Sequence, residues 1–148
     1  MPNAFFVDTN VFLYVKDPKG PPKRERAIAW LDALTQRNLA VISPQVLNEF
    51  AHNIIRKFPH VTERELRENM QAMRHWCRAP TSAETALLGL TIHHRFRLSF
   101  YDATLVAAAA TFGCTYFLSE DLGHNQRIGS LRIVNPFMSD PETILERD

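Results

Sequence analysis

The chain has 148 residues, of which 45% are hydrophobic, so it is long enough for one domain with its own core over residues 1–148 and too short for two. Its 17 basic and 16 acidic residues nearly cancel, which excludes a strong overall field for nucleic acid or an anionic membrane and leaves any polyanion to local patches. Because Cys77 and Cys114 form no metal-binding spacing and the N-terminus lacks a secretory signal pattern, we expect a reducing, cytoplasmic setting and no membrane partner.

The first part of the chain predicts a strand, a helix, a second strand and a second helix. Ala4–Val7 is apolar at every position, as a strand buried on both faces of a sheet should be. After a proline-rich break, apolar residues recur at helical spacing over residues 27–34. A short strand is expected at Ala40–Ile42. Ser43 then caps a further helix, and Pro44 occupies its first turn.

The rest of the chain predicts three more helices and two more strands. Thr62 with Glu65, and Thr81 with Glu84, match the capping-box pattern at the start of two helices. The remaining predicted elements are a helix at Tyr101–Phe112 that is closed by Gly113, and strands at Tyr116–Leu118 and Leu131–Val134.

Alternating β and α elements imply an α/β fold. We expect a three-layer sandwich, Rossmann-like, with helices on both faces of a central, mainly parallel sheet of four to five strands. In such folds ligands bind beyond the carboxyl ends of the strands. Asp8 follows the first predicted strand and Asp121 follows the third, so both are expected at that edge. Taken singly, Asp8 is equally explained as a helix cap and Asp121 as a turn residue.

Two further acidic residues are candidates on other grounds. Asp102 begins a helix that is apolar nearly all the way round and therefore predicted to be buried, so its carboxylate is either an N-cap or part of a site. Glu49 lies early in the helix after the second strand. A helical wheel places it roughly opposite Leu47, Ile54 and Phe58, which by itself predicts exposure to solvent.

Four short segments contain these acids in order: FVDTNVFLY, VLNEF, LSFYDATLVAAA and FLSEDL. In this order and spacing they resemble the four acidic motifs of the PIN domain, the metal-dependent nuclease fold of many bacterial toxins. The closing IGSLRIVNPF is similar to the tail of the VapC-like toxin branch. The resemblance covers essentially the whole chain, and it implies a PIN-like fold.

The resemblance also implies which residues act. It marks a catalytic and metal-ligating acidic tetrad of Asp8, Glu49, Asp102 and Asp121, with Thr9, Asn10 and Ser119 as polar neighbours that position water or substrate. The sequence departs from the family pattern at Tyr101, where tryptophan is frequent, and at His124 and Asn125, where small residues are common. Neither departure removes a carboxylate.

Four ionised carboxylates cannot crowd together without a counter-charge. Mg²⁺ or Mn²⁺, as hard cations that prefer oxygen ligands, supply it, and we expect one or two such ions as cofactor. A bound ion lowers the pKa of a coordinated water, polarises the scissile phosphate and, in a two-ion site, stabilises the leaving oxygen. Asp8 and Asp102 are expected to be the central ligands, with Glu49 and Asp121 completing the shell directly or through water.

Basic residues near the acids have two interpretations. Arg95 and Arg97 shortly precede Asp102, and Arg127 follows Asp121. They either hold substrate phosphates as positioning contacts without sequence information or are solvated surface charges.

The resemblance implies that the protein cuts RNA phosphodiester bonds as an endoribonuclease toxin. It also implies two partners, a second copy in a homodimer and a small antitoxin whose basic segment covers the acidic pocket. Housekeeping RNA processing and a catalytically silent binding module are the alternatives. A receiver-like phosphorylation domain is disfavoured because it needs paired acids after the first strand and a late lysine, whereas Asp8 is followed by Thr9 and no lysine occurs after Lys57. Phosphatases of the haloacid-dehalogenase type need a second aspartate where Asn10 stands.

Overall fold

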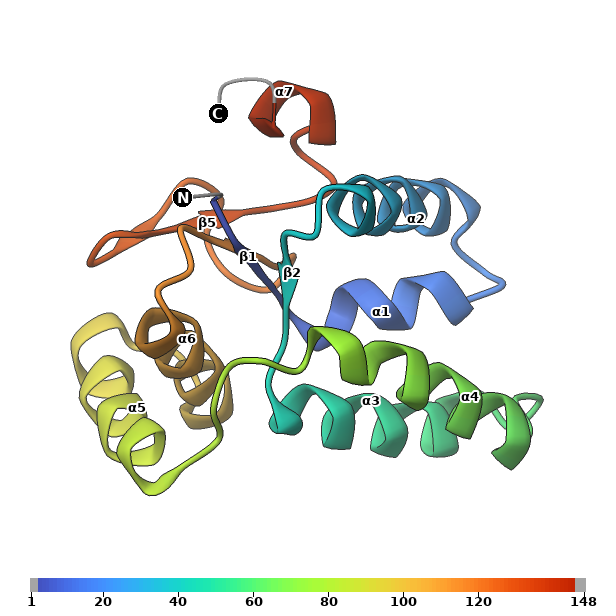
Figure 1. Ribbon diagram of the computed structural model, residues 1–148, viewed down its shortest axis with the longest axis horizontal. Helices are drawn as coiled ribbons and strands as arrows, with labels where there is room; N and C mark the ends of the chain where they lie inside the picture. Colours follow the sequence, from blue (N-terminus) through green and yellow to red (C-terminus); the bar gives the residue numbers. More distant parts are fainter. Residues whose placement is uncertain (1–2, 146–148) are drawn as a thin grey trace.

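The computed structural model describes residues 3–145, and it forms three layers with helices on both faces of a five-stranded sheet (Figure 1). The strands are β1 (Phe5–Val7), β2 (Ala40–Val41), β3 (Tyr116–Leu118), β4 (Arg127–Ile128) and β5 (Leu131–Val134). Their order is β2-β1-β3-β5-β4, and all neighbours are parallel except β4 and β5. The predicted α/β class and mainly parallel sheet are confirmed, and the four predicted strands are correct to within one residue.

The helices are α1 (Thr9–Lys16), α2 (Pro21–Gln36), α3 (Pro44–Lys57), α4 (Glu63–Met73), α5 (Ala83–Phe96), α6 (Phe100–Phe112) and α7 (Pro141–Leu145), with a 3-10 turn η1 (Arg74–Trp76) after α4. Proline occupies the first turn of α3, and Gly113 closes α6 with a positive φ of 94°, both as predicted. Strand β4 and helix α7 were not predicted, because two residues and a single turn are too short to show a period. Within residues 3–145, no helix combines the length and apolar character needed to cross a bilayer.

The two predicted capping boxes have different outcomes. Thr62 caps α4 by accepting the Glu65 N–H at 3.1 Å, as predicted. The box predicted at Thr81 is wrong, because Ser82 caps α5 and exchanges hydrogen bonds with Thr85. The Thr81 hydroxyl instead accepts the Gln45 N–H at the start of α3, 3.3 Å away. Thr81 therefore serves a different helix from the one that follows it.

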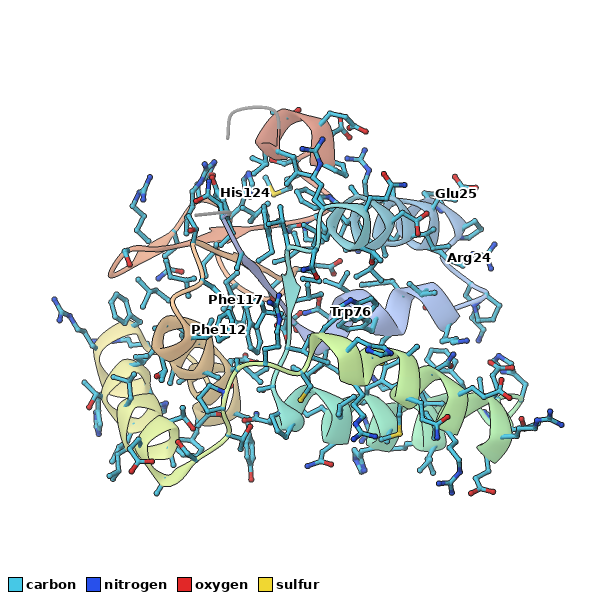
Figure 2. All side chains as sticks on the ribbon, in the orientation of Figure 1. Arg24, Glu25, Trp76, Phe112, Phe117 and His124 are labelled. Carbon is cyan, nitrogen blue, oxygen red and sulfur yellow. The ribbon has the colours of Figure 1, made fainter. Side chains whose placement is uncertain are left out.

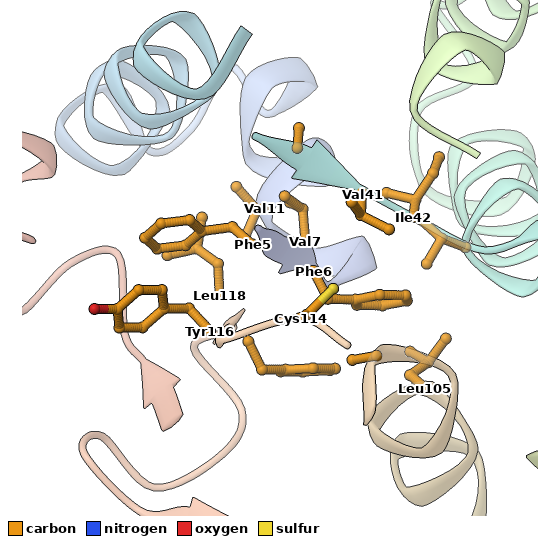
Figure 3. Packing of buried hydrophobic residues seen from close by; sticks show 14 of the residues in the cluster. Phe5, Phe6, Val7, Val11, Val41, Ile42, Leu105, Cys114, Tyr116 and Leu118 are labelled. Carbon is orange, nitrogen blue, oxygen red and sulfur yellow. The ribbon is translucent and has the colours of Figure 1, made fainter. Parts of the chain in front are cut away.

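The core fills both sides of the sheet because successive strand residues point to opposite faces. On one face Phe5 contacts Trp30 of α2 and stacks on Tyr116. On the other face Phe6 stacks on Phe117, and Figure 3 shows Phe6 directed toward Leu105 of α6. Figure 2 shows Phe117 in the interior, whereas Glu25 of α2 points outward. The sheet is therefore buried between two helical layers, and only its edges are left for a site.

Helices α5 and α6 pack closely at Gly89, and we expect Gly89→Ala to destabilise the protein. A Cβ built at this position lies 2.7 Å from Thr104 Cγ2 and 3.1 Å from Thr104 Cα. Alanine in a helix interior is normally better than glycine by about 1 kcal/mol, but a clash against backbone costs about 1–3 kcal/mol. Urea unfolding should therefore show a lower free energy of unfolding for Gly89→Ala than for the unaltered protein. A gain in stability for Gly89→Ala would contradict this packing.

Candidate active site

The site begins where β1 delivers Asp8 to the edge of the sheet and the chain turns into α1 (Figure 1). Strands β1 and β3 are parallel with Val7 opposite Leu118, so the residues that follow them, Asp8 and Ser119, lie side by side. Asp8 is 4% exposed, accepts the Thr9 N–H at 2.7 Å and accepts the Ser119 hydroxyl at 2.7 Å. Asp8 is thus the N-cap of α1 and also points into the site.

Three of the carboxyl groups interact electrostatically. Burial is the main cause that raises the pKa of Asp8 to about 7, and the negative charges of Asp102 and Asp121 add to it, while hydrogen bonds from Ser119 and Thr9 act in the opposite sense. Burial also raises the pKa of Asp102, with a further contribution from Asp121 that opposes the lowering effect of Ser99. The three carboxyl groups therefore share one region in which full ionisation is unfavourable.

The Asn10 side chain links two of these acids. Its Nδ2 donates to Asp121 Oδ2 at 2.9 Å and lies 3.3 Å from both Asp8 Oδ2 and Ser119 Oγ. The Asp121 N–H donates to Ser119 Oγ at 3.1 Å. The three polar residues predicted as neighbours of the acids, Thr9, Asn10 and Ser119, are accordingly hydrogen-bonded to them.

Glu49 lies in the same region although the helical wheel predicts exposure. The buried face of α3 consists of Val46, Phe50 and Ile54, and Glu49 sits at the border of that face, half-buried against α1. Its Oε1 accepts the Thr9 hydroxyl and its Oε2 accepts the Gln45 amide, both at 2.8 Å. The expectation of exposure is therefore wrong, because Leu47 and Phe58 are only partly buried and do not define the core face.

Gln45 was missed by the sequence analysis. Besides holding Glu49, its amide nitrogen donates to the Tyr101 carbonyl at 3.2 Å, and its amide oxygen accepts the Thr104 hydroxyl at 2.9 Å. Gln45 therefore ties α3 to the first turn of α6. The available signal was its position four residues before Glu49, on the same side of the helix.

Asp102 occupies the first turn of α6 but is not its N-cap. Ser99 caps this helix and accepts the Asp102 N–H at 3.2 Å, so the capping interpretation of Asp102 is wrong. The carboxylate is half-buried, interacts with the Ser99 hydroxyl and lies close enough to Asp121 to feel its charge. A negative charge in the first turn is also stabilised by the helix dipole.

All four acids line one cleft of about 400 Å³. The other residues that line it come from α1, from α3 and from the C-cap of each helix: Thr9, Asn10, Leu13, Tyr14, Asp17, Asn53, Lys57 and Phe58. Arg95 lies near the end of α5 over the Phe96 ring, and Arg97 is the C-cap of that helix. Neither arginine lines the cleft, and their role in holding substrate stays a prediction.

A family model described as PIN domain matches residues 5–127 of the chain. The chain belongs to the PIN domain family. The match runs from β1 to the start of β4 and includes all four acids of the cleft. The predicted family is therefore confirmed.

Structural comparison gives the same fold. A solved structure described as a toxin-antitoxin complex from Klebsiella pneumoniae superposes with a TM-score of 0.62 at 16% sequence identity, over 90% of this chain and 97% of the other. No curated protein sequence matches the chain significantly. The similarity at this level of identity concerns the PIN fold.

The donor chemistry of this PIN cleft suits a hard divalent cation. Four carboxylates line it, and burial together with the charges of neighbouring acids raises the pKa of Asp8 and of Asp102, so a cation that neutralises the cluster would be favoured there. Over residues 3–145, however, no three histidine, cysteine or acidic side chains are already gathered as a ligand cage. The oxygens are instead hydrogen-bonded to Asn10, Ser119, Thr9 and Gln45, so binding an ion requires these contacts to rearrange.

Proposed function

We propose that the protein is an endoribonuclease that uses a divalent metal ion and acts as the toxin of a toxin-antitoxin pair. The observation that carries the proposal is the convergence of four carboxylates, from four separate chain segments, on one cleft. PIN domains are generally nucleases, which supports hydrolysis of a phosphodiester bond. An intact acidic cleft argues against a domain that has kept only a binding role.

The residues that would hold the ion are Asp8 and Asp102 as central ligands, with Glu49 and Asp121 direct or through water. When bound, Mg²⁺ or Mn²⁺ supplies Lewis-acid polarisation of the phosphate and a water of lowered pKa. The donor set agrees with this preference, since all four side chains offer oxygen.

The polar neighbours position the acids and the substrate. Thr9 fixes one Glu49 oxygen, and Ser119 fixes one Asp8 oxygen, each through a hydroxyl that donates its proton. When these hydroxyl groups rotate away, each becomes a donor for a phosphate oxygen or a water. Asn10 offers two amide protons to the same region, and its Nδ2 donates to Asp121 and, at longer distance, to Asp8 and Ser119.

The proposed partners follow from the fold and from the charge of the cleft. The similar structure from Klebsiella pneumoniae is a toxin-antitoxin complex, which supports an antitoxin partner for this chain. A cleft lined by Asp8, Asp17, Glu49, Asp102 and Asp121 is complementary to a basic protein segment, which would block substrate access. We also propose that the toxin is a homodimer and that it acts in the cytoplasm.

Chelation should abolish the activity. The purified protein, free of any partner, is incubated with a mixed RNA pool and with single-stranded DNA in Mg²⁺ or Mn²⁺, and again with excess chelator. We expect RNA cleavage that requires the metal, because the acids cannot bind a phosphate without a cation. Re-addition of the metal after chelation should restore the rate.

The same assay separates the alternatives. Cleavage that persists in chelator would contradict the metal requirement. Cleavage of DNA in preference to RNA would contradict the substrate class. The absence of any cleavage, with RNA still bound, would favour a silent binding module.

A further inference from the structure

The cleft extends well beyond the acids. We use the name outer arm for the six lining residues on its far side: Leu13, Tyr14, Asp17, Asn53, Lys57 and Phe58. The first three come from α1 and its C-cap, and the last three from the end of α3 and its C-cap. Helices α1 and α3 are in contact and run in the same direction, away from the sheet (Figure 1). The outer arm is therefore a channel that continues from the site between two helices.

The length of this channel is set by helix geometry. Glu49, Asn53 and Lys57 are spaced four residues apart on α3, so they follow one side of the helix. At 1.5 Å per residue, Lys57 lies roughly 12 Å along the helix axis from Glu49. A phosphate held by Lys57 is therefore not the phosphate at the carboxylates but one farther along the same strand.

The outer arm contains the three kinds of group that bind a single-stranded nucleotide. Phe58 is partly buried and packs against the core, so its ring is held in place while part of it lines the cleft. Lys57 is exposed, and within residues 3–145 it forms no ion pair with a carboxylate. Asn53 Nδ2 donates to the Glu49 carbonyl oxygen at 2.8 Å. Asn53 Oδ1 has one long contact, 3.5 Å from an Arg56 nitrogen, and can accept a further hydrogen bond. Together they offer a stacking surface, a cation and an amide edge.

We propose that the outer arm binds a nucleotide that flanks the scissile bond of single-stranded RNA, with its base against Phe58 and a phosphate at Lys57. The proposal rests on the proposed function for the reaction at the carboxylates. A base-paired duplex is excluded because its bases are stacked inside and present no free face to Phe58. The outer arm thus selects unpaired RNA. Its two charged residues are the cation Lys57 and the anion Asp17, so it has one cation with which to hold a phosphate.

The test measures binding separately from cleavage. The full chain carrying Asp102→Asn is mixed in Mg²⁺ with a short, fluorescently labelled single-stranded RNA of mixed sequence, and Kd is measured by anisotropy over a series of salt concentrations. Lys57→Gln should weaken binding to all sequences and reduce the slope of log K against log salt by about 0.7. Phe58→Leu should weaken binding by about tenfold with an unchanged slope, because stacking is not ionic.

Matched controls make the outcomes distinct. Arg37→Gln removes a cation at the C-cap of α2, which is exposed and does not line the cleft, and it should change neither Kd nor slope. If Lys57→Gln behaves like Arg37→Gln and Phe58→Leu binds normally, the proposal is overturned and the channel takes another occupant, such as a protein segment. Thermal unfolding checks that Phe58→Leu is folded; if it is not, the exposed Lys57 still decides. If the unaltered chain cleaves RNA but neither variant changes RNA binding, the outer-arm proposal is refuted and the proposed nuclease function stands. If binding depends on Lys57 but no RNA is cleaved, only the proposed nuclease function is refuted.

Discussion

Replacing Asp102 with asparagine is expected to reduce RNA cleavage by at least about a thousandfold, which corresponds to ~4 kcal/mol of transition-state stabilisation. Asparagine has nearly the same shape, but it carries no negative charge to hold the metal. The fold should survive, because the Asp102 backbone N–H still reaches Ser99 and burial already disfavours the charged carboxylate. Initial rates on a fixed RNA, with thermal unfolding in parallel, measure both effects.

The control for this prediction is Asp32→Asn, the same chemical change at an exposed position of α2. It should leave both the cleavage rate and the unfolding temperature unchanged. Cleavage retained by Asp102→Asn and by Asp8→Asn would contradict the proposed site. Loss of cleavage together with loss of the folded state would be an effect on stability, and Asp8→Asn would then test the site.

The Asp8→Asn variant is expected to be more stable than the unaltered protein at alkaline pH in the absence of metal. The pKa of Asp8 is about 7 in the folded protein and 3.8 in the reference state, so the folded state binds the proton more tightly. The carboxyl group therefore opposes folding increasingly as the pH rises from about 4 to 7, and a difference of about three pH units corresponds to about 4 kcal/mol. Asparagine removes this penalty.

Urea unfolding in chelator at pH 5 and at pH 8 measures the effect. The unaltered protein should lose stability between the two values, and Asp8→Asn should lose less, while Asp32→Asn follows the unaltered protein. Added Mg²⁺ should stabilise the unaltered protein at pH 8 and have little effect on Asp8→Asn. A variant that is less stable at pH 8 would mean that the hydrogen bonds donated by Ser119 and Asn10 to Asp8 Oδ2, which asparagine cannot accept at its amide nitrogen, outweigh the buried charge.

The sequence predicts most of the sheet because β1 and β3 are buried on both faces and apolar throughout, and β5 is apolar and buried except at Arg132. The same feature places Asp8 and Asp121 near one edge before any coordinates are known, since parallel strands end together. The positions of these strands can be read from short runs of apolar residues in the sequence. Elements as short as β4 leave no such trace.

Glu49 is different, because its direction depends on how α3 packs against α1. A helical wheel drawn from the apolar residues of α3 places Leu47 and Phe58 on the core face. In the structure these two residues are only partly buried, and Val46 is fully buried. The family resemblance identified Glu49, and the pattern alone did not. Lys57 was missed for the same reason: its spacing from Glu49 is visible in the sequence, but its position in the cleft follows only from the contact between the two helices.

The pairing of β1 with β3 has a consequence for the synthesis of the protein. Asp8 leaves the ribosome early, but its hydrogen-bond partner Ser119 is 111 residues away and comes after the strand that completes the centre of the sheet. A growing chain that stops before Asp121 has neither β5 beside β3 nor the last acid of the cleft. Incomplete translation products therefore lack the complete acidic cleft, which can form only after nearly all of the PIN region has been translated.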